Sequence, residues 1–407
     1  MYRVTLIARL LAWISLMLVL GSPGVAHLRP AYAETEGVEE YRFPLAAGGY
    51  HACAARGGAL FCWGRNNEGQ LGNGTTANQS IPTAVSNMTN GVAVVVTSGS
   101  HTCAIKNKAL SCWGRNSTGQ IGDGSTAQRN QPTAVTNMNS GVTGAAAGWA
   151  HTCAIKNGGL WCWGFNGDGR LGDGTTTLRT TPTAVTNMGS GITAVAAATE
   201  HTCAIKNGAL FCWGANGQGQ LGDGTTTSRT TPTAVTNMNN NVTFVAAQGS
   251  HTCAIKGGAL FCWGWNAYGQ LGDGTTQNRN TPTPVTSMDS GVTFVAAGTF
   301  HTCAIKNRMM FCWGLNNQGA LGDNTSTQRN TPVQVSPPMN NDVLVIAAGG
   351  GTSMGIRTDS CLYSWGQNDY GQVGNGSTTS QYTPALVGPG CRWDPGPRLF
   401  MPILRRP

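Results

Sequence analysis

A sequence unit of fifty residues is repeated along this chain, and this repetition constrains the fold more than any other feature. The third copy begins at His151 and reads HTCAIKNGGLWCWGFNGDGRLGDGTTTLRTTPTAVTNMGSGITAVAAAT. The seventh copy, from Gly351, lacks the histidine and is two residues longer before its Trp365-Gly366. The seven copies occupy about residues 44–390 of the 407. A fixed period of this length indicates one supersecondary unit stacked many times.

The pattern inside each copy favours strands, because apolar residues alternate and turn residues are frequent. In the third copy, His151–Lys156 and Gly159–Gly164 flank Asn157-Gly158, the strongest short hairpin signal. Pro182–Val185 and Ile192–Ala197 are expected as two further strands, preceded by a long loop rich in Gly, Asn, Asp and Thr. Four short strands in each of seven copies predict an all-β, seven-bladed β-propeller. A parallel β-helix is the alternative fold, but it uses shorter repeats.

The sequence motifs that recur in each copy carry a family resemblance. Each copy reads as an alternating strand, Cys-Trp-Gly, Asn-x-x-Gly-Gln-Leu-Gly-Asp-Gly, Thr-Pro and Val-Ala-Ala-Gly, with small departures. The fourth copy shows the central motif without a gap, at Gly214, Asn216, Gly219, Gln220, Leu221, Gly222 and Gly224. The unit resembles the repeat of the regulator of chromosome condensation family. That resemblance covers seven of seven copies and implies a seven-bladed propeller, a scaffold that supports many functions.

Fourteen cysteines follow the repeat. In the predicted hairpin, Cys153 faces Cys162 as a non-hydrogen-bonded pair, with Cα atoms about 4.5 Å apart and within disulfide reach. Both positions change together in the seventh copy, to Ser353 and Ser364. We therefore expect six hairpin disulfides and a seventh that ties the C-terminal tail to the last blade. The pairs are Cys53–Cys62, Cys103–Cys112, Cys153–Cys162, Cys203–Cys212, Cys253–Cys262, Cys303–Cys312 and Cys361–Cys391.

Zinc binding and free thiols are the alternatives for these cysteines. His151, Cys153 and Cys162 could supply three zinc ligands, but zinc cysteines usually occur as closely spaced pairs with a fourth ligand. The recurring Gly-Asp-Gly is similar to calcium loops, yet each aspartate stands alone where calcium requires six to eight oxygens. We expect neither a metal nor a cofactor.

The other repeated residues have structural interpretations. The six histidines are expected to hydrogen-bond loops, the blade tryptophans to pack between blades, and Asp173 with Arg179 to tie down the long loop. Catalysis needs one asymmetric constellation, and neither a nucleophile elbow nor a phosphate loop occurs. The chain is therefore not expected to be an enzyme.

The ends of the chain differ in composition from the repeats. Arg3 and Arg9 precede an apolar stretch over 10–20, and Ala31-Tyr32-Ala33 follows, which predicts a signal peptide over residues 1–33. Cleavage is expected after Ala33, with Ala26 as the alternative site and an uncleaved anchor as the alternative reading. The propeller then spans 34–390 and a Pro/Arg-rich tail spans 391–407. Export to the periplasm, cell surface or medium follows, with no membrane association after cleavage.

Charge argues against nucleic acid as a partner. The net charge is +8, but residues 34–384 hold 18 basic and 16 acidic residues. A duplex-binding body normally shows a strong basic excess.

Positions that differ between copies are candidates for a binding surface, since scaffold positions repeat. Two clusters vary most: the pair before the histidine, and the loop after Trp-Gly. Because both adjoin the same hairpin, they are expected to form a ring around one face of the propeller. Its predicted binding residues are Tyr50, Arg65, Arg115, Trp149, Phe165, Glu200, Trp265, Tyr268, Phe300 and Tyr370. Tyr, Trp and Arg are enriched at protein-binding hot spots.

Three classes of function remain open at this stage. The resembled family includes nuclear exchange factors for a small GTPase and secreted bacterial binders of enzymes, and the export signal favours the second kind. We expect a monomeric, exported module that binds a protein through one propeller face. The alternatives are a propeller enzyme acting on extracellular glycan as a lyase or hydrolase, which would need a carboxylate pair in a groove, and a structural envelope or surface component.

Overall fold

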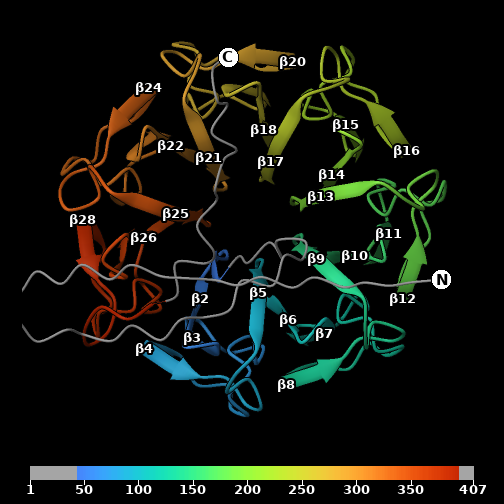
Figure 1. Ribbon diagram of the computed structural model, residues 1–407, viewed down its shortest axis with the longest axis horizontal. Helices are drawn as coiled ribbons and strands as arrows, with labels where there is room; N and C mark the ends of the chain where they lie inside the picture. The colour runs from blue at the N-terminus through green and yellow to red at the C-terminus, as the bar shows by residue number, and fades with distance from the viewer. Residues whose placement is uncertain (1–43, 394–407) are drawn as a thin grey trace, which may run out of the picture. The chain divides into compact units, whose positions relative to one another are not determined.

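Seven four-stranded antiparallel sheets are arranged around a central axis in the computed structural model, which describes residues 44–393 (Figure 1). Each sheet takes its four strands in chain order, from the centre outwards. The all-β, seven-bladed propeller predicted from the repeat is confirmed. Within the described range no helix is long and apolar enough to cross a membrane.

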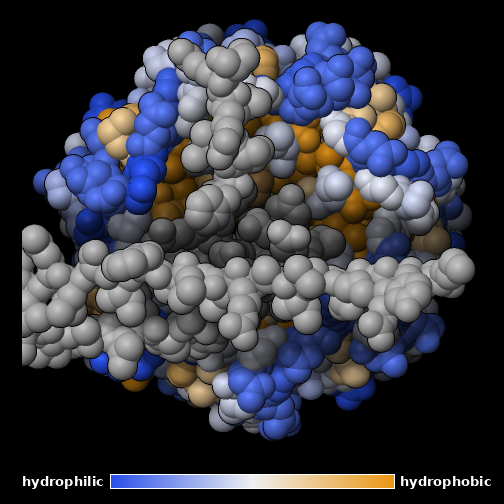
Figure 2. Space-filling view, in the orientation of Figure 1, coloured by the Kyte–Doolittle hydropathy of each residue, from blue (hydrophilic) through white to orange (hydrophobic). Residues whose placement is uncertain are grey.

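The two inner strands of each blade carry the apolar and histidine-containing parts of the repeat. The innermost strands are β1 (Leu45–Ala47), β5 (Val92–Thr97), β9 (Val142–Ala147), β13 (Ile192–Ala197), β17 (Val242–Gln248), β21 (Val292–Ala297) and β25 (Val343–Ala348). The second strands are β2 (His51–Arg56), β6 (His101–Lys106), β10 (His151–Lys156), β14 (His201–Lys206), β18 (His251–Lys256), β22 (His301–Lys306) and β26 (Thr352–Arg357). Their packed side chains place hydrophobic residues around the centre of the disc, with hydrophilic residues at the rim (Figure 2).

The two outer strands carry the Cys-Trp-Gly and Thr-Pro motifs. The third strands are β3 (Ala59–Gly64), β7 (Ala109–Gly114), β11 (Gly159–Gly164), β15 (Ala209–Gly214), β19 (Ala259–Gly264), β23 (Met309–Gly314) and β27 (Leu362–Gly366). The fourth strands are β4 (Gln79–Ala84), β8 (Arg129–Ala134), β12 (Arg179–Ala184), β16 (Arg229–Ala234), β20 (Arg279–Pro284), β24 (Arg329–Gln334) and β28 (Gln381–Leu386). The strand predicted over Pro182–Val185 is thus observed earlier, as β12, because its pairing with β11 extends from Ala184 back to Arg179.

The repeat and the blade are out of phase by one strand. The last strand of each of the first six copies joins the next blade, so that β5, for example, pairs with β6. The first blade receives β1 from residues that precede His51. The first six copies therefore each link two neighbouring blades through the backbone. Blades 7 and 1 meet without such a link, and we call this boundary the seam.

The hairpin register and the disulfides are as predicted. Cys153 lies opposite Cys162, and Ile155 lies opposite Leu160. All six hairpin cysteine pairs are bonded, with Cα–Cα distances of 4.1 Å. The short Cα spacing is that of a non-hydrogen-bonded pair. No free cysteine occurs among the described residues.

One detail of the seventh copy is corrected. Met354, not Ser353, lies opposite Ser364 and takes the place of the first cysteine. Ser353 takes the place of the repeated threonine, since it accepts a hydrogen bond from His301, 2.8 Å away. One of the two extra residues precedes these positions, since Val343 begins β25 51 residues after Val292 begins β21, and the other lies in the hairpin turn. Counting from the histidine alone therefore misplaces them by one. Both cysteine positions still change together.

The repeated tryptophan joins each blade to the preceding one, as predicted. Its buried indole N–H donates to a backbone carbonyl of that blade at 2.9–3.1 Å in all seven blades. The glycine of Leu-Gly lies against the indole: a Cβ on Gly222 would lie 2.5 Å from Nε1 of Trp263. Trp63 makes the same bond across the seam, to the carbonyl of Gln372.

The start of the predicted tail packs on the seam. Cys391 is bonded to Cys361, with their Cα atoms 4.1 Å apart. Trp393 is 2% exposed and packs on Phe61 and Trp63 of blade 1, at ring-centroid distances of 6.0 and 5.9 Å. The predicted seventh disulfide is thus present, and it anchors a residue that bridges blades 7 and 1. The predicted signal peptide over 1–33 and the tail after residue 393 lie outside the described residues.

Candidate protein-binding face

The two variable clusters lie at the same end of the propeller. In each blade the second strand pairs with the third, which brings the residue before the histidine next to the residue after Trp-Gly. In blade 1 the backbone N–H of Arg65 donates to the carbonyl of Tyr50 at 2.9 Å. We call this end, formed by the turn between the first two strands and the long loop between the last two strands, the loop face. The opposite end, formed by the β-hairpin turns and the connections between blades, is the hairpin face.

An aromatic cluster crosses the boundary between blades 5 and 6. Trp265 and Tyr268 come from the long loop after β19, and Phe300 comes from the turn before β22. The three rings meet edge to face, with centroids 5.4–5.7 Å apart. All three side chains are half-buried, so that each presents part of its surface to solvent.

A second cluster crosses the seam. Tyr50 and Tyr370 meet edge to face at 5.5 Å, and the guanidinium of Arg65 lies 5.5 Å from the centroid of each ring. A cation over aromatic faces is attracted by the ring quadrupole. The long loop of one blade thus meets the first turn of the next blade, as at blades 5 and 6.

The boundary between blades 3 and 4 carries charge beside one aromatic ring. Phe165 is 38% exposed, and the guanidinium of Arg170 lies 4.8 Å from its centroid. Arg170 also pairs with Asp168 and donates to the carbonyl of Thr199, next to the exposed Glu200. Arg170 is not among the binding residues predicted from the sequence. The signal was available, since this position is Gln in five copies, Ala320 in the sixth and Arg only here.

Two of the predicted residues stand apart from these groups. Trp149 is 45% exposed, and its ring lies on the backbone of the preceding blade: a Cβ on Gly99 would lie 2.5 Å from it. Arg115 is exposed and its Nε donates to Ser117 at 2.9 Å. The ten predicted residues therefore share one face, and eight of them form three groups at blade boundaries.

The long loops that present these residues are rigidly braced. In blade 4 the buried side chain of Asn216 donates to the carbonyls of Thr225 and Thr227 and accepts from the backbone N–H of Leu221. Asp223 and Arg229 form an ion pair at 2.8 Å, as predicted for this repeated pair. Burial alone would raise the pKa of Asp223, but hydrogen bonds from Thr225 and Arg229 outweigh it and lower that pKa below its usual value. The backbone of the loop face is therefore held by hydrogen bonds and ion pairs within each long loop.

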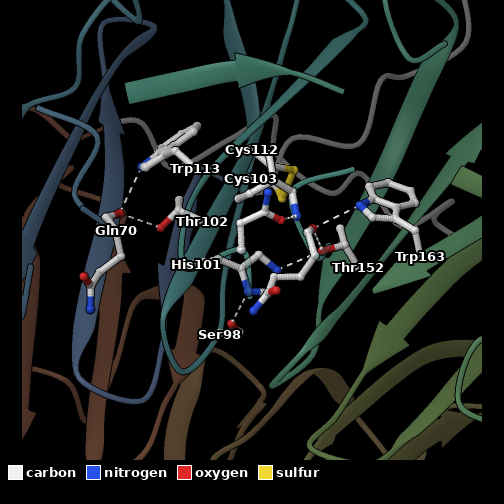
Figure 3. Close-up of a disulfide and its surroundings, with 12 residues drawn as sticks. Gln70, Ser98, His101, Thr102, Cys103, Cys112, Trp113, Thr152 and Trp163 are labelled. Atoms are coloured by element: carbon white, nitrogen blue, oxygen red, sulfur yellow. Dashed lines mark hydrogen bonds between the residues drawn. A yellow bond between two sulfur atoms is a disulfide. The ribbon is translucent and has the colours of Figure 1, made fainter. Parts of the chain in front are cut away.

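The repeated histidines are structural, and each begins the second strand of its blade. His101 donates from Nε2 to the hydroxyl of Thr152 in the next blade at 2.8 Å, and that hydroxyl donates to the carbonyl of Gln120 (Figure 3). The expectation that the histidines hydrogen-bond loops holds for His101, whose Nδ1 accepts from the hydroxyl of Ser98 in the preceding turn at 2.9 Å. The bond that recurs from copy to copy, however, is the one from Nε2 to the next blade. Burial lowers the pKa of His101 from 6.5 to about 3, which keeps the ring neutral. A buried, neutral, hydrogen-bonded imidazole of this kind is part of the core.

At the seam this hydrogen bond between histidine and threonine is absent, because neither blade supplies its residue. The first blade has Ala52 in place of the threonine, and the seventh has Thr352 in place of the histidine. The loss of both partners at the same boundary indicates that histidine and threonine act as one unit. Among residues 44–393, no group of three His, Cys, Asp or Glu side chains is arranged to bind a metal ion.

Sequence comparisons identify the repeat. Residues 136–395 match a family model described as RCC1-like domain. Residues 57–105 and 111–155 match a model described as regulator of chromosome condensation (RCC1) repeat.

Solved structures share the fold at low identity. Human WBSCR16 is 21% identical, with a TM-score of 0.72 over 81% of this chain and 94% of that chain. Yeast RCC1 (Prp20), solved with Kap60 bound, is 19% identical, with a TM-score of 0.71 over 90% of this chain and 91% of that chain. Prp20p from Saccharomyces cerevisiae, described together with its binding to Gsp1p and histones, is 21% identical, with a TM-score of 0.70 over 83% and 87% of the two chains.

Proposed function

Because the chain belongs to the RCC1-like domain family, we propose that it is an exported, monomeric protein-binding module that holds its partner on the loop face. RCC1-like propellers commonly serve as protein-interaction platforms, and yeast Prp20 has been solved with a protein, Kap60, bound to it. The fold alone supports many functions, so that the argument for this use depends on the surface residues.

The observation that carries the proposal is the cluster of Trp265, Tyr268 and Phe300. One blade earlier, the equivalent positions hold Ala215, Gln218 and Ser250. The strands on either side have the same register, although the turn before Ser250 is shorter because β17 runs on to Gln248. The scaffold therefore folds without aromatic residues there. Half-buried aromatic rings that pack edge to face on one another supply rigid contact area at a small entropic cost, which is the property of a hot spot.

Export is supported by the cysteines. Seven disulfides persist in an oxidising compartment and are rare where thiols are kept reduced. The expected signal peptide over 1–33 would deliver the chain to such a compartment.

A pull-down with the chain from residue 34 onward, from culture medium or an envelope extract, tests the proposal. The matched variant W265A/Y268Q/F300S rebuilds at blades 5 and 6 the surface that blades 4 and 5 already carry. A protein retained by the parent and lost from this variant supports the proposal. Retention of the same proteins by both, at equal affinity, would remove this cluster from the binding surface.

A further inference from the structure

Net positive charge is concentrated on the hairpin face, opposite the proposed binding surface. In blades 1–5 this face carries Arg56, Lys106, Lys108, Lys156, Lys206 and Lys256 at or beside the hairpin turns. The acidic residues of these blades up to residue 288 all lie in the loops of the other face, where most pair with arginines, as Asp173 does with Arg179. The net charge of residues 34–384 is thus nearly zero only because it is summed over two faces of different charge.

The acidic residues of the hairpin face are confined to one side of the disc. Asp289, Asp342 and Asp359 pair with Lys306, Arg308 and Arg357 at 3.2–3.6 Å, all in or beside blades 6 and 7. The six cations of blades 1–5 therefore form an arc without a facing carboxylate among the described residues.

The repeat sets these cations in one plane. Lys106, Lys156, Lys206 and Lys256 each end the second strand of their blade, and each Nζ donates to a carbonyl of the preceding connection, at 2.5–2.9 Å. Rotation about the propeller axis relates these positions, so that the ammonium groups stand at the same height on the disc. Each ammonium has three donors and uses one in these bonds, which leaves the others for an anion.

The same face lacks the features that other partners require. The hairpin turns and blade connections up to residue 342 contain no aromatic residue. Aromatic anchors dominate protein hot spots and provide the stacking platforms for single-stranded nucleic acids. A linear polyanion could contact these six cations only by bending along the circumference of the arc. A flat anionic surface would contact all six at once.

We propose that the hairpin face binds peripherally to an anionic lipid bilayer. Clustered basic residues near an anionic leaflet each strengthen binding, and the attraction extends over a Debye length. This orientation places the loop face away from the bilayer. The proposal modifies the expectation that the chain has no membrane association after cleavage of the signal peptide.

Sedimentation with vesicles tests this proposal independently of any protein partner. The chain from residue 34 onward is mixed with vesicles of phosphatidylcholine alone, or of phosphatidylcholine with equal parts of phosphatidylglycerol. We expect binding only to the anionic vesicles, and release when salt is raised from about 0.05 to about 0.5 M. The variant K156Q/K206Q/K256Q should bind about a hundredfold more weakly, since each cation contributes about fivefold.

The charge-retaining variant K156R/K206R/K256R is the matched control and should bind the anionic vesicles like the parent. Thermal unfolding of both variants establishes that the blades are intact. If the parent ignores anionic vesicles, or if the glutamine variant binds them equally well, the proposal is wrong. Salt-sensitive binding to heparin or duplex DNA without vesicle binding would also overturn it, in favour of a linear polyanion.

Discussion

Trp113 and Thr102 donate to the same backbone oxygen, the carbonyl of Gln70 in the preceding blade, at 2.9 and 2.8 Å. The Thr102 hydroxyl in turn accepts from Nε2 of His51, 2.7 Å away (Figure 3 draws both bonds to Gln70, and the equivalent bond of His101 to Thr152). One carbonyl therefore gathers a buried indole, a hydroxyl and, indirectly, an imidazole at each such boundary. Removing any one donor leaves its buried partners with fewer hydrogen bonds, which is costly in the core.

Substitution of a glycine beneath the indole should be strongly destabilising. Gly222 has a φ of +72°, and a Cβ there would lie 2.5 Å from Nε1 of Trp263. We expect Gly222→Ala to lower the free energy of unfolding by about 2–4 kcal/mol, through overpacking and backbone strain. Gly217→Ala is the control, because a Cβ there meets nothing within 4 Å. Chemical denaturation of both variants checks this, and equal stability would contradict the packing described.

Acidification should destabilise the propeller through its histidines. Burial lowers the pKa of His201 from 6.5 to about 3 and that of His301 to about 4. The unfolded chain therefore binds protons first, so that stability is full above pH 6.5 and falls as the pH drops towards the folded pKa. Each such histidine should cost about 1.4 kcal/mol per pH unit in this window. Urea unfolding between pH 7 and 5 measures the slope; imidazole signals that titrate near 6.5 in the folded state would disprove the cause.

The histidine and the threonine should be energetically coupled. Thr252→Ala alone removes the hydroxyl that accepts from His201 and donates to the Gln220 carbonyl, and should cost about 1–3 kcal/mol. The double variant H201T/T252A reproduces the pairing of the seam, Thr352 with Ala52. A double-mutant cycle should show that it costs less than the sum of the two single variants. Strict additivity would mean that the two residues act separately.

The disulfide at the seam should matter more than a hairpin disulfide. Cys361–Cys391 spans 30 residues and anchors Trp393, whereas Cys203–Cys212 spans 9 within a hairpin that already favours closure. In the chain-entropy model, loss of the first costs about 3.7 kcal/mol and loss of the second at most about 2.7 kcal/mol. Unfolding of C361S/C391S and C203S/C212S compares them directly. Non-reducing mass spectrometry should find all seven pairs in the parent.

Binding and folding should separate on the loop face. W265A/Y268Q/F300S should unfold within about 1 kcal/mol of the parent, since the matching positions one blade earlier carry the substituted residues. Trp263→Ala should instead lose about 3–5 kcal/mol, because that ring is fully buried between blades. The opposite ranking would mean that the aromatic cluster belongs to the core, and the binding surface would then lie elsewhere.

The sequence by itself determined what is local. Alternation with period two and the Asn157-Gly158 turn set the strands and the hairpin register, and hence the pairing of Cys153 with Cys162, because partners nine residues apart leave little freedom. Counting the copies determined the number of blades. The tertiary structure alone decided the contacts that cross blades: the transfer of the last strand to the next blade, the hydroxyl 51 or 52 residues away that accepts from each histidine, and the aromatic rings that meet. It also decided which face each charge occupies. These contacts depend on the closure of the ring, which brings distant copies side by side at an angle that no single copy encodes.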